Sequence, residues 1–126
     1  MSPATNEHRM YQAKIVALLS RLLASGMMIS KCSFQPREGV KVADVAWASD
    51  DFMRRNRREN PFPEAPELCV GILSPSNTLA KWTKRKILYF ARGAMEFWIY
   101  GKNGDIPFHK NTGALSQSEQ VSQCSI

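Results

Sequence analysis

The sequence GVKVADVAW at Gly39–Trp47, followed by PELCVGILSPS at Pro66–Ser76, decides the fold of this chain. Both stretches are short apolar runs bounded by glycine or proline, which is typical of buried β-strands. The first run contains one acidic residue, Asp44, among alanines and valines. Burying an ionised carboxylate without a partner costs several kcal/mol. We therefore expect Asp44 to have a function or a local hydrogen-bonding partner.

The remaining sequence predicts helices and hairpins around these two strands. Apolar residues recur every three or four positions over 7–25, as in an amphipathic helix, and a second helix is expected from Ser76 or Asn77 to about Arg92. Residues 50–66 are expected to form a short helical turn and a surface loop. Strands are expected at 27–34, 40–48, 68–73, 95–100 and 106–109.

This order of elements predicts an α/β fold, with a mixed sheet flanked by helices in a single domain. The chain has 126 residues with 44% hydrophobic content, enough for one core and too few for two. We expect the domain to span residues 1–112. Residues 113–126 are rich in Ser and Gln and are expected to be loosely ordered.

The net charge of +6 and the pI of about 9.5 favour a polyanionic partner such as nucleic acid. The three cysteines lie far apart without a Cys-x-x-Cys pair, so neither a disulfide framework nor a zinc ribbon is indicated, and a reducing cytoplasm fits. No secretory leader and no apolar run of membrane-spanning length occurs. We expect a cytoplasmic protein that does not bind a membrane.

Two groups of basic residues are candidates for contacts with phosphate. Four arginines crowd the predicted loop, and the second helix places further cations on one arc with Leu79, Thr83 and Phe90 opposite, where they can pack. Such a basic face is either solvated or a phosphate-contacting surface, and the sequence leaves both open. The candidates are Arg54, Arg55, Arg57 and Arg58 in the loop, and Lys81, Lys84, Arg85 and Arg92 on the helix.

Several classes of enzyme are disfavoured. No Gly-x-Ser-x-Gly elbow surrounds Ser74 or Ser76, and no glycine-rich nucleotide loop occurs. His8 and His109 have no metal-ligand spacing to each other or to a cysteine. The remaining classes are hydrolysis assisted by a hard metal ion, and binding alone.

Three blocks of the sequence resemble the Uma-type family of restriction-endonuclease-like bacterial proteins, which have the PD-(D/E)XK nuclease fold. The blocks are VADVAW at 42–47, APELCVGILSPS at 65–76 and LYFARGAMEFW at 88–98. Their order and spacing extend the resemblance from about Asn6 to Ser116. The resemblance implies a Mg²⁺- or Mn²⁺-dependent endonuclease acting on nucleic acid, with DNA as the expected substrate.

The resemblance also implies a metal site in which one ligand is missing. Asp44 corresponds to the first family acid, and the backbone carbonyl of Ile72 is a further expected ligand. The second acid falls at Gly71, a residue without a side chain. Lys84 and Arg85 are the candidate cations beside Asp44. Arginine replaces the lysine of relatives at position 85, and it stays protonated, so it cannot act as a base.

Two hypotheses of different classes follow. In the first, the chain is a nuclease-fold protein whose phosphodiester hydrolysis is weak or lost because Gly71 replaces the acid. In the second, it is a non-catalytic module that binds nucleic acid or another partner through Lys81 and the four loop arginines. A homodimer, in which a second chain supplies the missing acid, is left open.

Overall fold

The structure, a computed structural model, describes residues 6–101, 108–110 and 113–115, the last two segments by their backbone alone. The described residues form three helices and one six-stranded sheet. Their order is α1 (Asn6–Leu22), β1 (Met27–Phe34), β2 (Lys41–Ala48), α2 (Asp50–Asn56), β3 (Leu68–Ile72), α3 (Leu79–Ala91), β4 (Glu96–Tyr100), β5 (Phe108–Lys110) and β6 (Gly113–Leu115). The α/β fold with a mixed sheet is confirmed.

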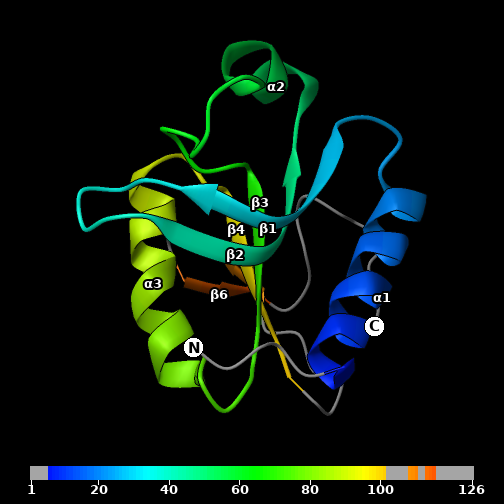
Figure 1. Cartoon of the computed structure of the whole chain (residues 1–126), viewed down its shortest axis with the longest axis vertical. Coiled ribbons are helices and arrows are strands. Elements are labelled where there is room, and N and C mark those ends of the chain that lie inside the picture. The colour runs from blue at the N-terminus through cyan, green and yellow to red at the C-terminus, as the bar shows by residue number, and fades with distance from the viewer. Residues whose placement is uncertain (1–5, 102–107, 111–112, 116–126) are drawn as a thin grey trace.

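The strands lie in the sheet in the same order as in the chain. Neighbouring strands are antiparallel except β3 and β4, which are parallel and are joined through α3. A parallel pair requires such a crossover because its second strand must restart at the same end of the sheet. Figure 1 shows α1 and α3 on opposite sides of the sheet. All residues of β3 and β4 are therefore buried.

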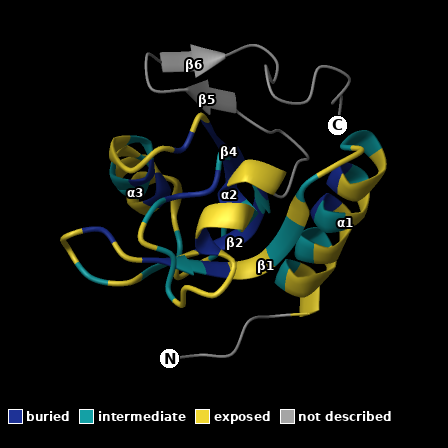
Figure 2. Cartoon of the chain, turned by 90° about the horizontal axis from the view of Figure 1, so that it is seen from above, coloured by how far each residue is buried: buried dark blue, intermediate teal, exposed yellow. Residues whose placement is uncertain are grey.

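Two apolar clusters fill the spaces between the sheet and the helices. On the α1 side, Ile15 and Leu19 pack against strand residues that include Val45 and Val70. On the α3 side, Trp82 and Tyr89 pack against residues that include Phe97. Figure 2 shows the buried residues gathered where the helices meet the sheet. Asp44 and Gly71 lie between these two layers.

The face that α3 presents to the sheet differs from the predicted one. Of the three residues expected to pack, Phe90 does lie against the apolar cluster, but Leu79 and Thr83 are exposed. Trp82 and Tyr89 face the sheet instead. They are large and lie seven residues apart, two turns of a helix, so burying both rings sets the rotation of α3.

The start of α3 also differs from the prediction. Its N-cap is Thr78, whose hydroxyl accepts a hydrogen bond from Lys81 N at 3.3 Å. Ser76 and Asn77 precede the helix, where Ser74 Oγ accepts a hydrogen bond from Asn77 N at 3.0 Å. The turn after the SPS sequence thus takes one or two more residues than expected before the helix begins.

Part of the C-terminal region lies outside the described residues, including most of the predicted turn after Gly101 and residues 116–126. Within the stretch predicted to be a loose tail, Gly113–Leu115 is a strand that pairs with β5. None of the described helices has the length and apolar character needed to cross a membrane.

Candidate functional site

Asp44 lies in β2 with 8% of its surface exposed, and its carboxylate has two neighbours. Oδ2 accepts a hydrogen bond from Ile72 N at 2.7 Å, and Oδ1 lies 3.4 Å from His8 Nε2 at the start of α1. Burial raises the pKa of the Asp44 carboxyl, whereas the Ile72 N–H, His8 and Lys31 oppose that increase. The expected local partner is therefore the N–H group of Ile72, together with the His8 ring.

The backbone around Asp44 departs from a regular ladder. The last residues paired between β2 and β3 on this side are Val45 and Val70, and continuing that register by one position brings Gly71 opposite Asp44. Ala43 and Ala46 both belong to the cluster on the α3 side, so strict alternation breaks between them. The ladder between β1 and β2 pairs Ser30 and Cys32 but not Lys31, which has a φ of 50°. The Asp44 carboxylate is thereby placed against the backbone of β3.

The space beside Gly71 is occupied by the indole of Trp82. A Cβ atom added to Gly71 would lie 2.4 Å from Trp82 Cδ2, far inside van der Waals contact. The same indole donates a hydrogen bond from Nε1 to the carbonyl oxygen of Ile72 at 3.2 Å. Trp82 therefore fills the space beside Gly71, where the resemblance implies an acid, and donates a hydrogen bond to the carbonyl that the resemblance implies as a metal ligand.

The residues present do not fit a hard divalent cation. Magnesium requires near-octahedral oxygen coordination, with carboxylates supplying most of the protein's charge. Here one carboxylate, that of Asp44, already accepts from a backbone N–H, and the Ile72 carbonyl accepts from an indole. In the described part of the chain no group of three or more His, Cys, Asp or Glu side chains gathers around a common point.

Glu67, the acid nearest along β3, does not compensate for Gly71. Its carboxylate accepts hydrogen bonds from Ser49 N at 3.0 Å and from Ser49 Oγ. Ser49 is the N-cap of α2, and its Oγ also accepts a hydrogen bond from Phe52 N at 3.1 Å. Glu67 thus fixes the start of α2.

The two cations predicted beside Asp44 are both on α3. Lys84 is exposed on α3. Arg85 is half-buried and its guanidinium carbon lies 5.2 Å from the centroid of the Trp82 ring, a cation–π distance. Among the described residues, no ion pair joins either cation to Asp44.

Sequence reasoning missed the roles of Trp82 and His8. Trp82 is fully buried, and its indole contacts the place that a side chain at Gly71 would take. A glycine in a buried strand could have predicted it, because a missing side chain leaves room for a large neighbour. The position of His8 at the start of α1 gave no such indication, since only the tertiary fold brings it to Asp44.

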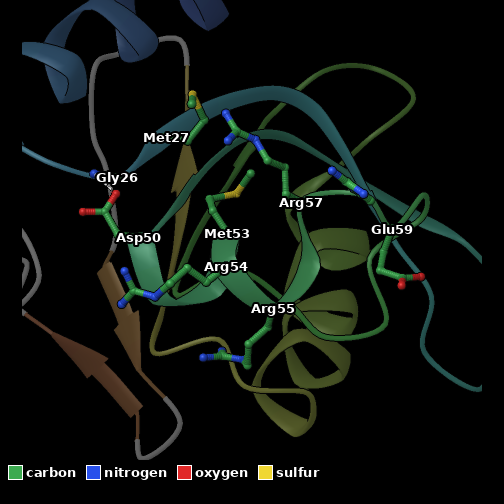
Figure 3. A pocket seen from close by; sticks show the side chains of 9 residues that line it. Gly26, Met27, Asp50, Met53, Arg54, Arg55, Arg57 and Glu59 are labelled. Carbon is green, nitrogen blue, oxygen red and sulfur yellow. Dashed lines mark hydrogen bonds between the residues drawn. The ribbon is translucent and has the colours of Figure 1, made fainter.

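A separate feature is the arginine group at α2, which we call the α2 arginine surface: Arg54, Arg55, Arg57 and Arg58. It lines an open pocket of about 730 Å³ together with Met27 and Asp50. Figure 3 shows the side chains of Arg54, Arg55 and Arg57 pointing in different directions around this pocket. The expected exposure of all four is confirmed.

Two of these arginines already have acidic partners. Arg54 forms an ion pair with Asp51, and Arg55 Nη2 lies 2.7 Å from Glu64 Oε1. Lys81, the remaining predicted contact, donates from Nζ to the carbonyl of Ser76 at 2.8 Å. Figure 1 shows that its position, the first turn of α3, lies at the end of the molecule opposite to α2. Lys81 is therefore not part of the α2 arginine surface.

Comparisons with known proteins agree with this fold. The family described as "Putative restriction endonuclease" (Uma2) matches residues 1–123. The crystal structure of "a putative nuclease belonging to DUF820" from Anabaena variabilis is similar, with a TM-score of 0.72 and 16% identity over 96% of this chain and 76% of that chain. No curated protein matches. Since the family match covers nearly every residue, the chain belongs to the Uma2 restriction-endonuclease-like family.

Proposed function

We propose that this chain is a nuclease-fold protein that has lost metal-dependent phosphodiester hydrolysis. The observation that supports this most strongly is the position of Trp82, whose indole fills the space beside Gly71 and donates to the Ile72 carbonyl. Of the three oxygen ligands expected from the family resemblance, one is absent and one is occupied. Asp44 alone is left, and it too has a hydrogen-bonding partner.

The expected loss of activity is large. A metal ion stabilises the transition state of hydrolysis by several kcal/mol, and losing even about 3 kcal/mol slows the reaction on the order of a hundredfold. Weaker metal binding adds to that loss. Arg85 offers no substitute base, because a guanidinium stays protonated and this one stacks on Trp82.

The test is a cleavage assay with supercoiled plasmid DNA in the presence of Mg²⁺ or Mn²⁺. The wild-type protein is compared with Asp44→Asn, which keeps the size of the side chain and an acceptor for the Ile72 N–H. We expect equal, background-level cleavage from both proteins. Metal-dependent cleavage by the wild type that is abolished in Asp44→Asn would refute the proposal.

A second candidate function, binding of nucleic acid without cleavage, is favoured by the α2 arginine surface. Arg57 and Arg58 are exposed, and in the described part of the chain neither forms an ion pair. They can therefore contact phosphates without first breaking a contact within the protein. The net charge of +6 supports the same class of partner.

This function is tested by measuring the affinity for duplex DNA as a function of salt concentration. The Arg57→Ala/Arg58→Ala variant should bind more weakly, and the slope of log K against log salt should fall by about 2, because each lost phosphate contact contributes about 0.9. The matched control is Lys14→Ala/Arg21→Ala, which removes two exposed charges from α1. Equal effects of the two double variants would show that net charge, and not this surface, determines binding.

A further inference from the structure

We infer that Trp82 is the residue that excludes a divalent cation from this site, and that Gly71 and Trp82 form a matched pair. The inference rests on the proposed loss of metal-dependent hydrolysis and assigns its structural cause. It predicts that restoring the acid at position 71 is not sufficient to restore metal binding.

The Trp82 side chain contacts both positions where the resemblance implies a metal ligand beside Asp44, residue 71 and the Ile72 carbonyl. Its ring atoms Cδ2, Cε2 and Cε3 lie 2.4 to 2.6 Å from the place of a Cβ at residue 71, so any side chain there meets the ring face. Its Nε1 lies 3.2 Å from the Ile72 carbonyl oxygen, the neighbouring ligand position. The indole N–H that donates to this oxygen places its partially positive hydrogen where a cation would bind.

The indole cannot easily turn away. Trp82 is 0% exposed, and its ring lies 5.7 Å from the Phe97 ring, centroid to centroid. Arg85 covers the ring from α3, with its guanidinium carbon 5.2 Å from the centroid. The Trp82 backbone N–H donates to Thr78 O at 3.0 Å in the first turn of the helix. A glutamate at position 71 must therefore displace a large, packed ring.

Truncating Trp82 should reopen the site for a hard cation such as Mn²⁺ or Mg²⁺. Position 71 directly precedes Ile72, whose backbone N–H donates to Asp44 Oδ2 at 2.7 Å, so a side chain at residue 71 starts one residue from the Asp44 carboxylate's partner. A glutamate there, Asp44 and the freed Ile72 carbonyl together supply three oxygen donors of the kind these ions prefer.

The experiment is calorimetric titration of the whole chain with Mn²⁺, followed in parallel by thermal unfolding. Four variants are compared with the wild type: Gly71→Glu, Trp82→Ala, Gly71→Glu/Trp82→Ala, and the control Gly71→Gln/Trp82→Ala, which has the same shape without the charge. We expect Mn²⁺ binding in the Glu/Ala double variant at least about tenfold tighter than in any other protein.

Two results would overturn the inference. One is Gly71→Glu alone binding Mn²⁺ as tightly as the Glu/Ala double variant, which would show that Trp82 does not block the site. The other is a folded Glu/Ala double variant that binds no better than its Gln control. Neither affects the proposed function, which instead fails if the wild-type protein itself binds Mn²⁺ and cleaves DNA.

Because removing a buried tryptophan can prevent folding, a measurement on the wild type completes the test. Hydrogen exchange of the Trp82 indole N–H, followed by NMR, reports whether this N–H donates a hydrogen bond to the Ile72 carbonyl oxygen. Slow exchange, like that of buried backbone amides, supports the inference. Exchange as fast as in the urea-unfolded chain would overturn it.

Discussion

The contact between Gly71 and Trp82 makes a quantitative prediction about stability. In Gly71→Ala, the new Cβ would lie 2.4 Å from Trp82 Cδ2, whereas ordinary contacts begin near 3.4 Å. The φ angle of Gly71 is not in the positive range, so the cost comes from crowding and not from the backbone. Overpacking a core costs about 1–3 kcal/mol. We expect the upper half of that range, because Trp82 is fully buried.

The cause can be isolated with a double-mutant cycle in which Gly71→Ala is made in the wild type and in Trp82→Leu. The smaller leucine leaves room for the added methyl group, so the substitution should cost less there, with a coupling energy of about 1–2 kcal/mol. Gly101→Ala is the matched control, because among the described residues its Cβ would meet the flexible end of Leu73, at 3.2 Å. We expect that control to cost less than about 1 kcal/mol.

The assay is urea unfolding followed by circular dichroism, with the free energy of unfolding obtained by linear extrapolation at a constant slope. The reasoning is refuted if Gly71→Ala changes the free energy of unfolding by less than about 0.5 kcal/mol. It is also refuted if the cost is the same in both backgrounds, because the crowding would then have another source.

Three further predictions concern the residues around the site. Ser49→Ala should lower the free energy of unfolding by about 1 kcal/mol, since it removes the N-cap of α2 and the hydroxyl bonded to Glu67; urea unfolding of Ser49→Thr, which keeps the hydroxyl, is the control. Burial raises the pKa of Asp44, so the folded state binds this proton more tightly than the unfolded state does. The free energy of unfolding of the wild type should therefore fall relative to that of Asp44→Asn as pH rises from about 4 through the raised pKa. A difference between the two proteins that does not change with pH would contradict this. Burial raises the pKa of Cys32 to about 12 and that of Cys69 well above its ordinary value, so mass spectrometry after iodoacetamide treatment at pH 8 should find both thiols labelled only in urea.

The proposed loss of hydrolysis and the proposed binding of nucleic acid are compatible in one molecule. The space beside Gly71 that the Trp82 indole fills lies between β3 and α3. The α2 arginine surface is at α2, which Figure 1 shows beyond the ends of the strands. Substitutions at one location can therefore be tested without altering the other. This separation makes the two proposals independently falsifiable.

The sequence by itself predicted the family and the first five strands but not the strand Gly113–Leu115, and it shows a glycine where the resemblance implies an acid. Apolar runs such as Leu68–Ile72 predict buried strands because their local pattern has few alternatives, and the predicted strand at 27–34 agrees with β1. The glycine at position 71 is visible without coordinates. The rotation of α3 was predicted incorrectly, because the arc of a helix that faces the core depends on which rings the sheet can accommodate.

Only the tertiary structure decided what replaces the missing acid. Trp82 lies eleven residues after Gly71 and on a different element, and His8 lies thirty-six residues before Asp44, so no local spacing links either pair. Their contacts arise when two helices dock on opposite faces of the sheet and each buried polar atom must find a partner. The physical reason is that side-chain packing and hydrogen-bond satisfaction are properties of the assembled core, whereas strand formation and acid content are properties of the chain.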